Sequence, residues 1–469
     1  MNDLKRFRKK SVLRWTVVAF MVVPASCGDS FLEAKPDSSL LIPATLEDCQ
    51  KILDDTGVAL SNFPVSGVLA SDEYTLDYQF WLSHYSPYER NTYLWADDLY
   101  EGQRESSDWD YSFSAIYHLN AVLETLDDIP ITEDNKTVHD NLKGSALFHR
   151  AYRYFSLSEV FTLPYQSTSA ESTLGLPIRK SADIDEISDR TSLKETYDFI
   201  LDDFNIAVAL LKESGPDFRL HRPSKAAAFG ALAKVYLTMG DFGNALKNAE
   251  DCLAHHDLLK DYNELNTEEN FNFTNNPEII FGANRAGSAF LYPYPRANGL
   301  HVDKILFDLY GNNDLRKTAF FIMDIDGAIK RKYLYSYDGL RLQCFGGIAT
   351  NEILLIKAEC LARLNRVDEA QETLAKLLSK RFITDTYQPQ QFDSSNELLN
   401  VILEERRKEL VFSGARWGDV RRLNAAGENI QMSRTLNGQT YSIIAGSNKF
   451  AFPIPPNEID LAGLIQNPR

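Results

Sequence analysis

The sequence predicts a mainly α-helical protein in which helices pack in pairs and are interrupted by a loop-rich insert. Three observations support this fold class. Apolar residues recur at spacings of three and four over long stretches, and small residues repeat at matching places in two helical segments. A stretch rich in Asn, Gly, Pro and Tyr separates these segments. With 44% hydrophobic and 25% charged residues, the 469-residue chain has the composition of a globular protein with a large core.

Residues 1–26 are expected to be an export signal and not part of the fold. A basic segment, 5–14, precedes an apolar stretch, 15–23, that is far shorter than the roughly 20 residues of a membrane-spanning helix. Ala25 and Ser26 lead directly into Cys27, which suits a bacterial lipobox whose thiol is acylated and anchors the protein. An ordinary secretory signal with an incidental Cys at this place is the alternative.

The charge and the motifs exclude several classes of function. The net charge is −17, and removal of the basic signal leaves the remaining chain still more acidic, so nucleic acid and anionic lipid would be repelled. His-Glu-x-x-His, Gly-x-Gly-x-x-Gly and phosphate-loop motifs are absent from the sequence, and no metal or cofactor is expected. The other cysteines have no metal-type spacing and are expected to be buried free thiols; they are Cys49, Cys252, Cys344 and Cys360.

The helix signals are clearest in the middle of the chain. Ser192 and Glu195 form a capping box ahead of an apolar stripe that runs to Leu211. Pro223-Ser224 then opens a helix over 226–239, and Gly240-Asp241 separates it from a further helix through Leu253. Because the connecting turn is so short, the two helices are expected to pack as a hairpin.

The same layout recurs over residues 351–380 at a constant offset. The matching pairs are Ala233 with Ala358, Gly240 with Asn365, Ala245 with Ala370, and Ala249 with Leu374. Small residues at these places let paired helices approach closely, as in tetratricopeptide helix pairs. The helix-rich stretch 140–160 also carries small residues of this kind. The copies are not in tandem at the ~34-residue period, so no simple solenoid is predicted. The alternative is a chance similarity between two Ala-rich helices.

These signals divide the chain after the export signal, 27–469, into regions of one domain. The helical scaffold is expected to cover about 40–260 and 348–425. The insert, about 261–347, is expected to be mostly non-helical, with a short strand near 278–282. The C-terminal segment, 426–469, is expected to be extended, because Pro453, Pro455 and Pro456 cannot continue a helix.

Several short runs, in order along the chain, together resemble the SusD/RagB family. They are Cys27 with Phe31-Leu32 and Pro36, Arg150-Ala151-Tyr152-Arg153-Tyr154-Phe155, Arg222-Pro223-Ser224-Lys225-Ala226-Ala227, Glu405-Arg406-Arg407-x-Glu409-Leu410, Arg416-Trp417-x-Asp419, and Pro453-Ile454-Pro455. Ser413 and Val420 depart from the Glu and Leu that the family usually has there.

The resemblance implies a single, mainly helical SusD-like domain with tetratricopeptide-like helix pairs, lipid-anchored at Cys27 on the outer face of the outer membrane of a Bacteroidetes-type bacterium. It implies a non-catalytic protein that captures oligosaccharides and passes them to a SusC-like TonB-dependent transporter. Capture of peptides by a member of the same family is an alternative. A glycan hydrolase is a further alternative, because the 66 Asp and Glu could supply the two carboxylates that glycosidases use.

The charged cluster near the C-terminus is interpreted as structural. Paired carboxylates beside arginines can carry acid–base chemistry, but Arg–carboxylate forks also lock helices together. The residues assigned to this structural network are Glu405, Arg406, Glu409, Arg416, Trp417 and Asp419.

Ligand contacts are instead expected from aromatic side chains, because the flat C–H faces of sugars stack on rings. The segment 81–95 is predicted to be a loop, since Ser86, Pro87 and Asn91 break its periodicity. Its candidate residues are Trp81, Tyr85, Tyr88, Asn91, Tyr93 and Trp95, and the insert adds Tyr292, Tyr294, Arg296 and Asn298. For all of these, packing in the protein interior is the alternative. The segment Trp109, Tyr111, Phe113 and Tyr117 is expected to be a packed helix.

Overall fold

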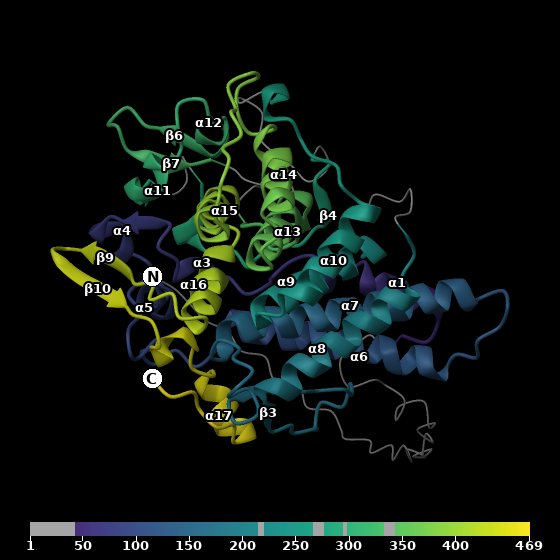
Figure 1. The fold of residues 1–469 in the computed structure, drawn as a ribbon. Helices are drawn as coiled ribbons and strands as arrows, with labels where there is room; N and C mark the ends of the chain where they lie inside the picture. Colours follow the sequence, from purple (N-terminus) through teal and green to yellow (C-terminus); the bar gives the residue numbers. More distant parts are fainter. Residues whose placement is uncertain (1–42, 214–219, 266–275, 294–297, 333–342) are drawn as a thin grey trace, which may run out of the picture. The chain divides into compact units, whose positions relative to one another are not determined.

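Helices dominate the chain, as the sequence predicts. The computed structural model describes residues 43–213, 220–265, 276–293, 298–332 and 343–469, which belong to one structural unit (Figure 1). The expected export signal, 1–26, and Cys27 lie outside the described residues. The fold class is therefore confirmed for the described part of the chain, in which helices far outnumber the short strands.

The longer helices are α1 (Leu46–Leu53), α6 (Ser107–Asp128), α7 (Lys136–Phe161), α8 (Leu193–Leu210), α9 (Lys225–Met239), α10 (Phe242–His255), α13 (Thr350–Arg363), α14 (Val367–Leu378), α15 (Ser395–Glu409) and α16 (Ala415–Ala425). The shorter ones are α2 (Thr56–Ala59), α3 (Ser66–Leu69), α4 (Tyr78–Leu82), α5 (Pro87–Tyr93), α11 (Lys304–Asp308), α12 (Arg316–Phe320) and α17 (Pro456–Ala462). Helix α8 begins with the predicted capping box, because Ser192 and Glu195 each accept a hydrogen bond from the other's backbone N–H.

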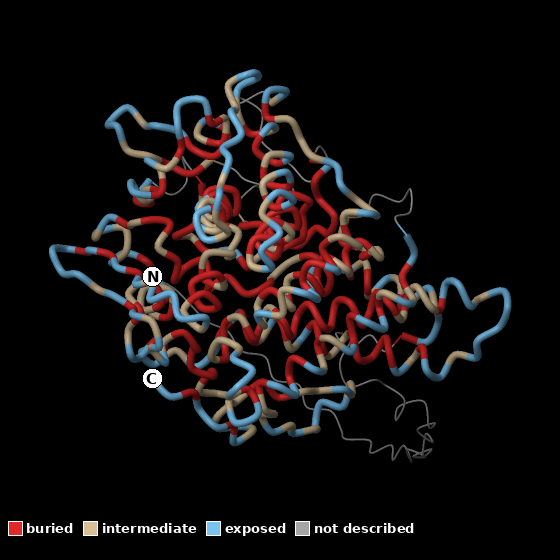
Figure 2. The backbone as a smooth tube through the Cα atoms, in the orientation of Figure 1, coloured by how far each residue is buried: buried red, intermediate tan, exposed pale blue. Residues whose placement is uncertain are grey.

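The scaffold is an array of helices that pack on their neighbours. In the described chain, α6 packs on α7, α7 on α8, α8 on α9 and α9 on α10; α10 then packs on α13, which also contacts α14 and α15 (Figure 1). The insert separates α10 from α13 in the sequence, yet these two helices lie side by side in the fold. Figure 2 shows buried residues along the inner faces of these helices.

The two predicted helix hairpins, α9–α10 and α13–α14, are confirmed. Gly240 ends α9 with φ 76°, and Asn365 follows α13 with φ 59°, so the two aligned residues adopt the same left-handed conformation. The small residues predicted to allow close approach are fully buried; they are Ala233, Ala245, Ala249, Ala358 and Ala370. Because bulkier side chains here would push the paired helices apart, this pattern sets their spacing.

Short two-stranded sheets connect the insert to the scaffold. Strand β4 (Ile279–Phe281), at the predicted place, pairs antiparallel with β8 (Ile348–Ala349), and β5 (Leu300–Val302) pairs with β1 (Tyr74–Leu76). The other antiparallel pairs are β6 (Phe321–Met323) with β7 (Ile329–Arg331) and β2 (Leu174–Pro177) with β3 (Arg190–Ser192). The insert thus reaches back to the N-terminal part of the scaffold through β1.

The C-terminal segment differs from the extended chain expected for 426–469. Strands β9 (Met432–Leu436) and β10 (Gln439–Ile443) form a hairpin, and helix α17 follows. The expectation is wrong at α17 because Pro456 occupies the start of that helix, where the missing N–H of proline costs nothing. Asn467 fastens the end of the chain by donating to the carbonyls of Phe161 and Phe452, each at 2.7 Å.

A network of buried ion pairs joins α13, α15 and α16. Arg422 on α16 binds both carboxylate oxygens of Glu359 on α13, at 2.6 and 2.7 Å. Arg406 on α15 binds Asp419 on α16 at 2.9 Å and Glu352 on α13 at 3.3 Å. Although burial alone would raise the pKa of Glu359, Arg422 and Arg363 lower it to about 2.

The same network extends into the insert through Glu409 on α15. Its carboxylate binds Arg316 at 3.0 Å and Arg381 at 2.8 Å, and all three side chains are fully buried. Arg381 also binds Glu278, next to β4, at 2.6 Å. The insert is therefore held to the helices by charge pairs as well as by its strands.

Replacement of Glu359 tests the network. Glu359→Gln leaves the buried Arg422 without its bidentate partner, so the free energy of unfolding should fall by about 3 kcal/mol at pH 7. Because the folded pKa is about 2 against an ordinary 4.5, the contribution of Glu359 is present above pH 4.5 and is lost as the pH falls towards 2. Urea unfolding at pH 7 and pH 3 should therefore show a smaller difference between variant and wild type at the lower pH.

Glu369→Gln is the matched control, because Glu369 pairs with Arg366 while 53% of its side chain is exposed. It should change stability by less than about 1 kcal/mol. Equal losses in the two variants would contradict a stabilising role for the buried network.

Candidate functional site

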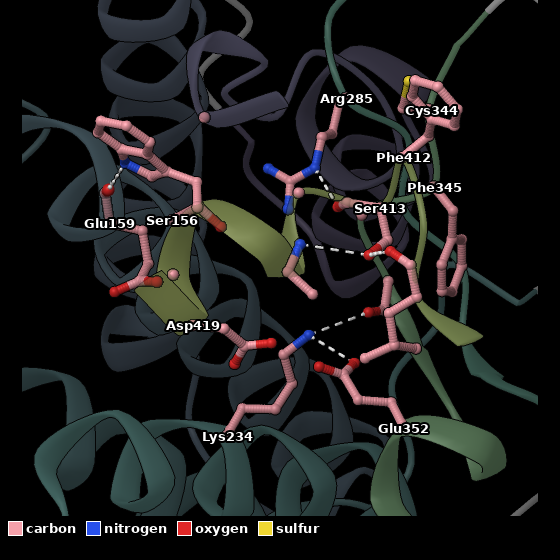
Figure 3. Close-up of a pocket in the computed structure, with 18 of the residues that line it drawn as sticks. Ser156, Glu159, Lys234, Arg285, Cys344, Phe345, Glu352, Phe412, Ser413 and Asp419 are labelled. Carbon is pink, nitrogen blue, oxygen red and sulfur yellow. Dashed lines mark hydrogen bonds and ion pairs between the residues drawn. The ribbon is translucent and has the colours of Figure 1, made fainter. Parts of the chain in front are cut away.

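The charged residues near the C-terminus surround a small internal cavity of about 100 Å³ (Figure 3). Lys234 reaches into it and binds Glu352 at 2.8 Å, while Arg285 donates to the carbonyl oxygens of Ser413 and Pro64, each at 2.6 Å. Ligand pockets for drug-sized molecules are usually 300–1,000 Å³, so this cavity has room for a few waters and not for an oligosaccharide. Many of its polar groups are bound within the protein, whereas Nε and Nη2 of Arg331 and Nη1 of Arg406 have no partner among the described residues.

The predicted structural network makes intramolecular contacts at every member. Glu405 binds Arg316 at 2.6 Å and Lys408 at 2.7 Å. Arg416 binds both oxygens of Asp72, at 2.7 and 2.8 Å. The Trp417 indole donates to the carbonyl of Glu159 at 3.1 Å. Together with the contacts of Arg406, Glu409 and Asp419 given above, these pairs support a structural role for the cluster.

The aromatic candidates lie on another part of the chain, around α4. Tyr78 and Trp81, three residues apart on this helix, stack with ring centroids 5.9 Å apart and an interplanar angle of 21°. The Trp81 indole donates to the carbonyl of Arg90 at 3.0 Å, and the Arg90 guanidinium lies 6.0 Å from the Trp81 ring centroid. Both rings are half-buried. Trp81 is thus held in place while part of its ring remains accessible.

Tyr85 projects from the turn that follows α4. Its side chain is 83% exposed, the most of any large aromatic side chain in the described residues. His84, beside it, is buried and packs on Phe290 with centroids 3.9 Å apart. The His84 ring also binds Glu89 at 2.9 Å, and Ser288 donates to the same carboxylate oxygen. The buried neighbour therefore fixes the backbone from which Tyr85 projects.

The insert is brought against α4 at this place. A Cβ atom at Gly299, just before β5, would lie 2.3 Å from the Phe80 side chain, so only glycine fits the close approach. The pKa of Tyr85 is raised, first by partial burial and then by Glu89, Tyr292 and Tyr111. Phe290, two positions before Tyr292, packs on His84 beside Tyr85, and Tyr292 packs with Tyr78 and Trp81 against the same buried cluster. We call Tyr78, Trp81, Tyr85 and Tyr292 the aromatic surface.

The predicted loop 81–95 is wrong in its second half. Ser86 caps α5 by accepting from the Glu89 N–H, and Pro87 starts the helix, so the residues that break the apolar period are a helix start signal. Tyr88 and Tyr93 are buried within α5 and Trp95 just beyond it. Burial removes the faces of these three rings from any ligand.

The buried rings have intramolecular partners. Arg434 of β9 places its guanidinium over Tyr93 at 4.0 Å and Trp95 at 4.2 Å. The Tyr88 hydroxyl pairs with Ser66 at 3.0 Å. Asn91, half-buried, donates to the Glu101 carboxylate at 3.0 Å. Burial makes the expectation of ligand contact wrong for Tyr88, Tyr93 and Trp95, whereas for Asn91 it stays a prediction.

The remaining candidates from the insert have different outcomes. Tyr292 is half-buried within the aromatic surface and Asn298 is exposed, with its carbonyl accepting from Lys330. Tyr294 and Arg296 lie outside the described residues. Sequence reasoning missed Tyr78, and it wrongly expected Tyr111 to pack inside α6, where it is 48% exposed. Tyr111 is two positions from both Trp109 and Phe113, which places it on the opposite helix face.

The described residues form neither a metal-binding cluster nor a membrane-spanning helix. Within them, no three His, Cys, Asp or Glu side chains gather in a way that could hold a metal ion. No helix in the same part of the chain is long and apolar enough to cross a membrane. The cysteines expected to be buried free thiols, Cys49, Cys252, Cys344 and Cys360, are all buried and unbridged.

Comparisons with known proteins agree with the architecture. A family model described as "Starch-binding associating with outer membrane" matches residues 30–237, and a model of the SusD family matches residues 350–469. SusD-like protein P2 of Formosa agariphila is 26% identical over 398 residues, which cover 72% of this chain and 75% of that protein. SusD-like protein P38 of the same organism is 22% identical, covering 93% and 95%.

Solved structures share the fold. A putative sugar binding protein from Bacteroides vulgatus superposes with a TM-score of 0.73 at 21% identity, over 92% of this chain and 99% of that one. A SusD superfamily protein from Bacteroides thetaiotaomicron gives 0.71 at 22% identity, over 91% and 100%. The fold is thus that of a helical-scaffold protein with inserted surface segments. The chain belongs to the SusD/RagB family.

Arg416→Ala tests the structural role of the cluster. Loss of the bidentate contact leaves Asp72 poorly compensated in a largely buried place, so the variant should lose about 2 kcal/mol of stability and keep its ligand affinity. Arg104→Ala, which breaks an exposed pair with Asp460, should change stability little. Thermal melting and calorimetric titration measure both properties. Lost binding at an unchanged melting temperature would assign Arg416 to the ligand site instead.

Proposed function

We propose that this protein is a non-catalytic cell-surface lipoprotein that captures oligosaccharides at its aromatic surface and passes them to a SusC-like TonB-dependent transporter. The observation that carries the proposal is the exposure of Tyr85, just after the half-buried Trp81 of α4, on a backbone held by buried contacts of His84. Rings fixed in this way can stack on sugar faces at little cost in side-chain entropy.

The chemistry around the aromatic surface suits a neutral ligand. The nearby carboxylate of Glu89 is bound by His84 and Ser288, so it is already hydrogen-bonded, and the Arg90 guanidinium donates to the carbonyl of His84. Phenol hydroxyls and the exposed amide of Asn298 remain to bind sugar hydroxyls. The names of the related proteins, which include a starch-binding family description and a putative sugar binding protein, support the same ligand class.

The cellular setting follows from the start of the chain and from the family. The family description places its members in association with the outer membrane. Acylation of Cys27 would supply the anchor, since two or more acyl chains hold a protein stably on a bilayer. Transfer to a partner transporter accounts for a binding protein at this place that has no chemistry of its own.

Removal of a ring from the aromatic surface should weaken capture. Trp81→Ala and Tyr85→Ala should each weaken oligosaccharide binding about tenfold or more, because each removes a stacking ring. Isothermal titration with products analysed on the same samples measures affinity and turnover together. Tyr236→Ala, on α9 and away from the aromatic surface, is the matched control and should bind as wild type. Release of new reducing ends would show a hydrolase, and binding confined to peptides would favour peptide capture.

The anchor is tested separately at Cys27. Cys27→Ala should abolish incorporation of labelled fatty acid and move the protein from the membrane fraction to the soluble fraction. Cys49→Ala, which alters a buried thiol of α1, is the control and should leave both properties unchanged. Normal acylation of the Cys27→Ala protein would contradict the proposed anchor.

A further inference from the structure

A second cavity, of about 590 Å³, lies between α14 and α15 under the segment 382–392. Its volume falls in the range of small-molecule binding pockets and is several times that of the internal cavity of Figure 3. We call it the α14–α15 groove; Figure 1 shows the two helices that form its walls. The lining shares no residue with the aromatic surface, so it is a separate place on the scaffold.

Aromatic rings and amides dominate the cover of the groove. Phe382 and Tyr387 are in contact, with ring centroids 5.4 Å apart, and Phe392 completes a half-buried set of three rings. Four glutamines line the same space; they are Gln371, Gln388, Gln390 and Gln391. Leucines and Val401 form the floor. This combination presents apolar faces for stacking beside amide groups that can both donate and accept hydrogen bonds.

Two of these polar groups have hydrogen-bonding capacity that no other described residue uses. The Oε1 atom of Gln371 accepts from the Phe392 N–H at 2.9 Å, which fixes the amide on α14. Its NH₂ group has no partner among the described residues, and neither does the Tyr387 hydroxyl. Partial burial, and then Glu405, raise the pKa of Tyr387 to about 12, so the hydroxyl keeps its proton and can donate. Both groups can therefore bind a ligand without first losing a bond within the protein.

The charges of the groove restrict the ligand. Its lining contains four carboxylates and no Lys, Arg or His. Glu405 is bound by Arg316 and Lys408, whereas Asp368, Glu372 and Glu404 make no ion pair in the described part of the chain. An anionic sugar would meet uncompensated like charge, whereas a neutral sugar hydroxyl can donate to these oxygens.

We propose that the α14–α15 groove is a second binding site for a neutral saccharide, independent of the aromatic surface. The ligand class rests on the proposed function, and the second site goes beyond it. Tyr387 and Phe392 would stack on a sugar ring while the Gln371 amide and the Tyr387 hydroxyl bind its hydroxyls.

Calorimetric titration of the complete protein with neutral hexasaccharides of glucose and xylose, and with oligogalacturonate as the anionic probe, tests the second site. Wild type should bind a neutral hexasaccharide at two sites. Tyr387→Ala and Gln371→Ala should each remove or weaken about tenfold one of them, while Tyr85→Ala should affect the other. Tyr387→Phe, which keeps the ring, should retain part of the affinity and serves if the alanine variant unfolds. Oligogalacturonate should not bind at the groove.

The outcomes separate the two proposals. Loss of a site in Tyr85→Ala with no change in Tyr387→Ala or Gln371→Ala would overturn the second site and leave the proposed function intact. The reverse pattern would support the groove and move saccharide capture away from the aromatic surface. Absence of any saccharide binding by the wild type would overturn both. Binding of oligogalacturonate that Tyr387→Ala abolishes would overturn the neutral-ligand assignment.

Discussion

The fold depends on buried pairing between arginines and carboxylates at the meeting point of α13, α15 and α16. Charges this deeply buried are costly unless each has a partner of opposite sign in good geometry. Arg422 and Glu359 satisfy that requirement with a two-point contact, and Glu409 does so by binding two arginines at once. Because each of these pairs joins different elements, the network ties the helices together in this arrangement.

The network also determines where the insert lies. Arg316 and Glu278, both from the segment between α10 and α13, are bound into the network through Glu409 and Arg381. The strand pairs β4–β8 and β1–β5 then fix the direction of the insert across the scaffold. As a result, the part of the insert that carries Tyr292 packs, through Phe290, on His84 beside Tyr85, more than 200 positions earlier in the sequence. The aromatic surface, assembled from distant segments, therefore depends on ion pairs elsewhere in the protein.

Burial separates the two kinds of aromatic residue in this protein. Tyr93 and Trp95 sandwich Arg434 and close the interface between α5 and β9, while Trp81 and Tyr85, a few residues earlier, remain accessible. A stacked ring with a satisfied polar edge is stable in either setting. Local composition is therefore a poor guide to function at such a segment, and so is the presence of Pro87, which starts a helix as readily as it interrupts one.

The sequence by itself determined the helical class, the two matched helix hairpins and the cap at Ser192, because these follow from local periodicity, small residues and capping rules. It did not determine which rings face solvent, the helix at Pro456, or the groove between α14 and α15. The helix at Pro456 is a local feature, because proline suits the first turn of a helix as well as it interrupts one. The accessible rings and the groove depend on contacts between different elements, such as Arg434 with Trp95 and Phe392 with Gln371. Only the tertiary structure decided them, since a side chain is accessible or buried according to what packs against it and not according to its neighbours in sequence.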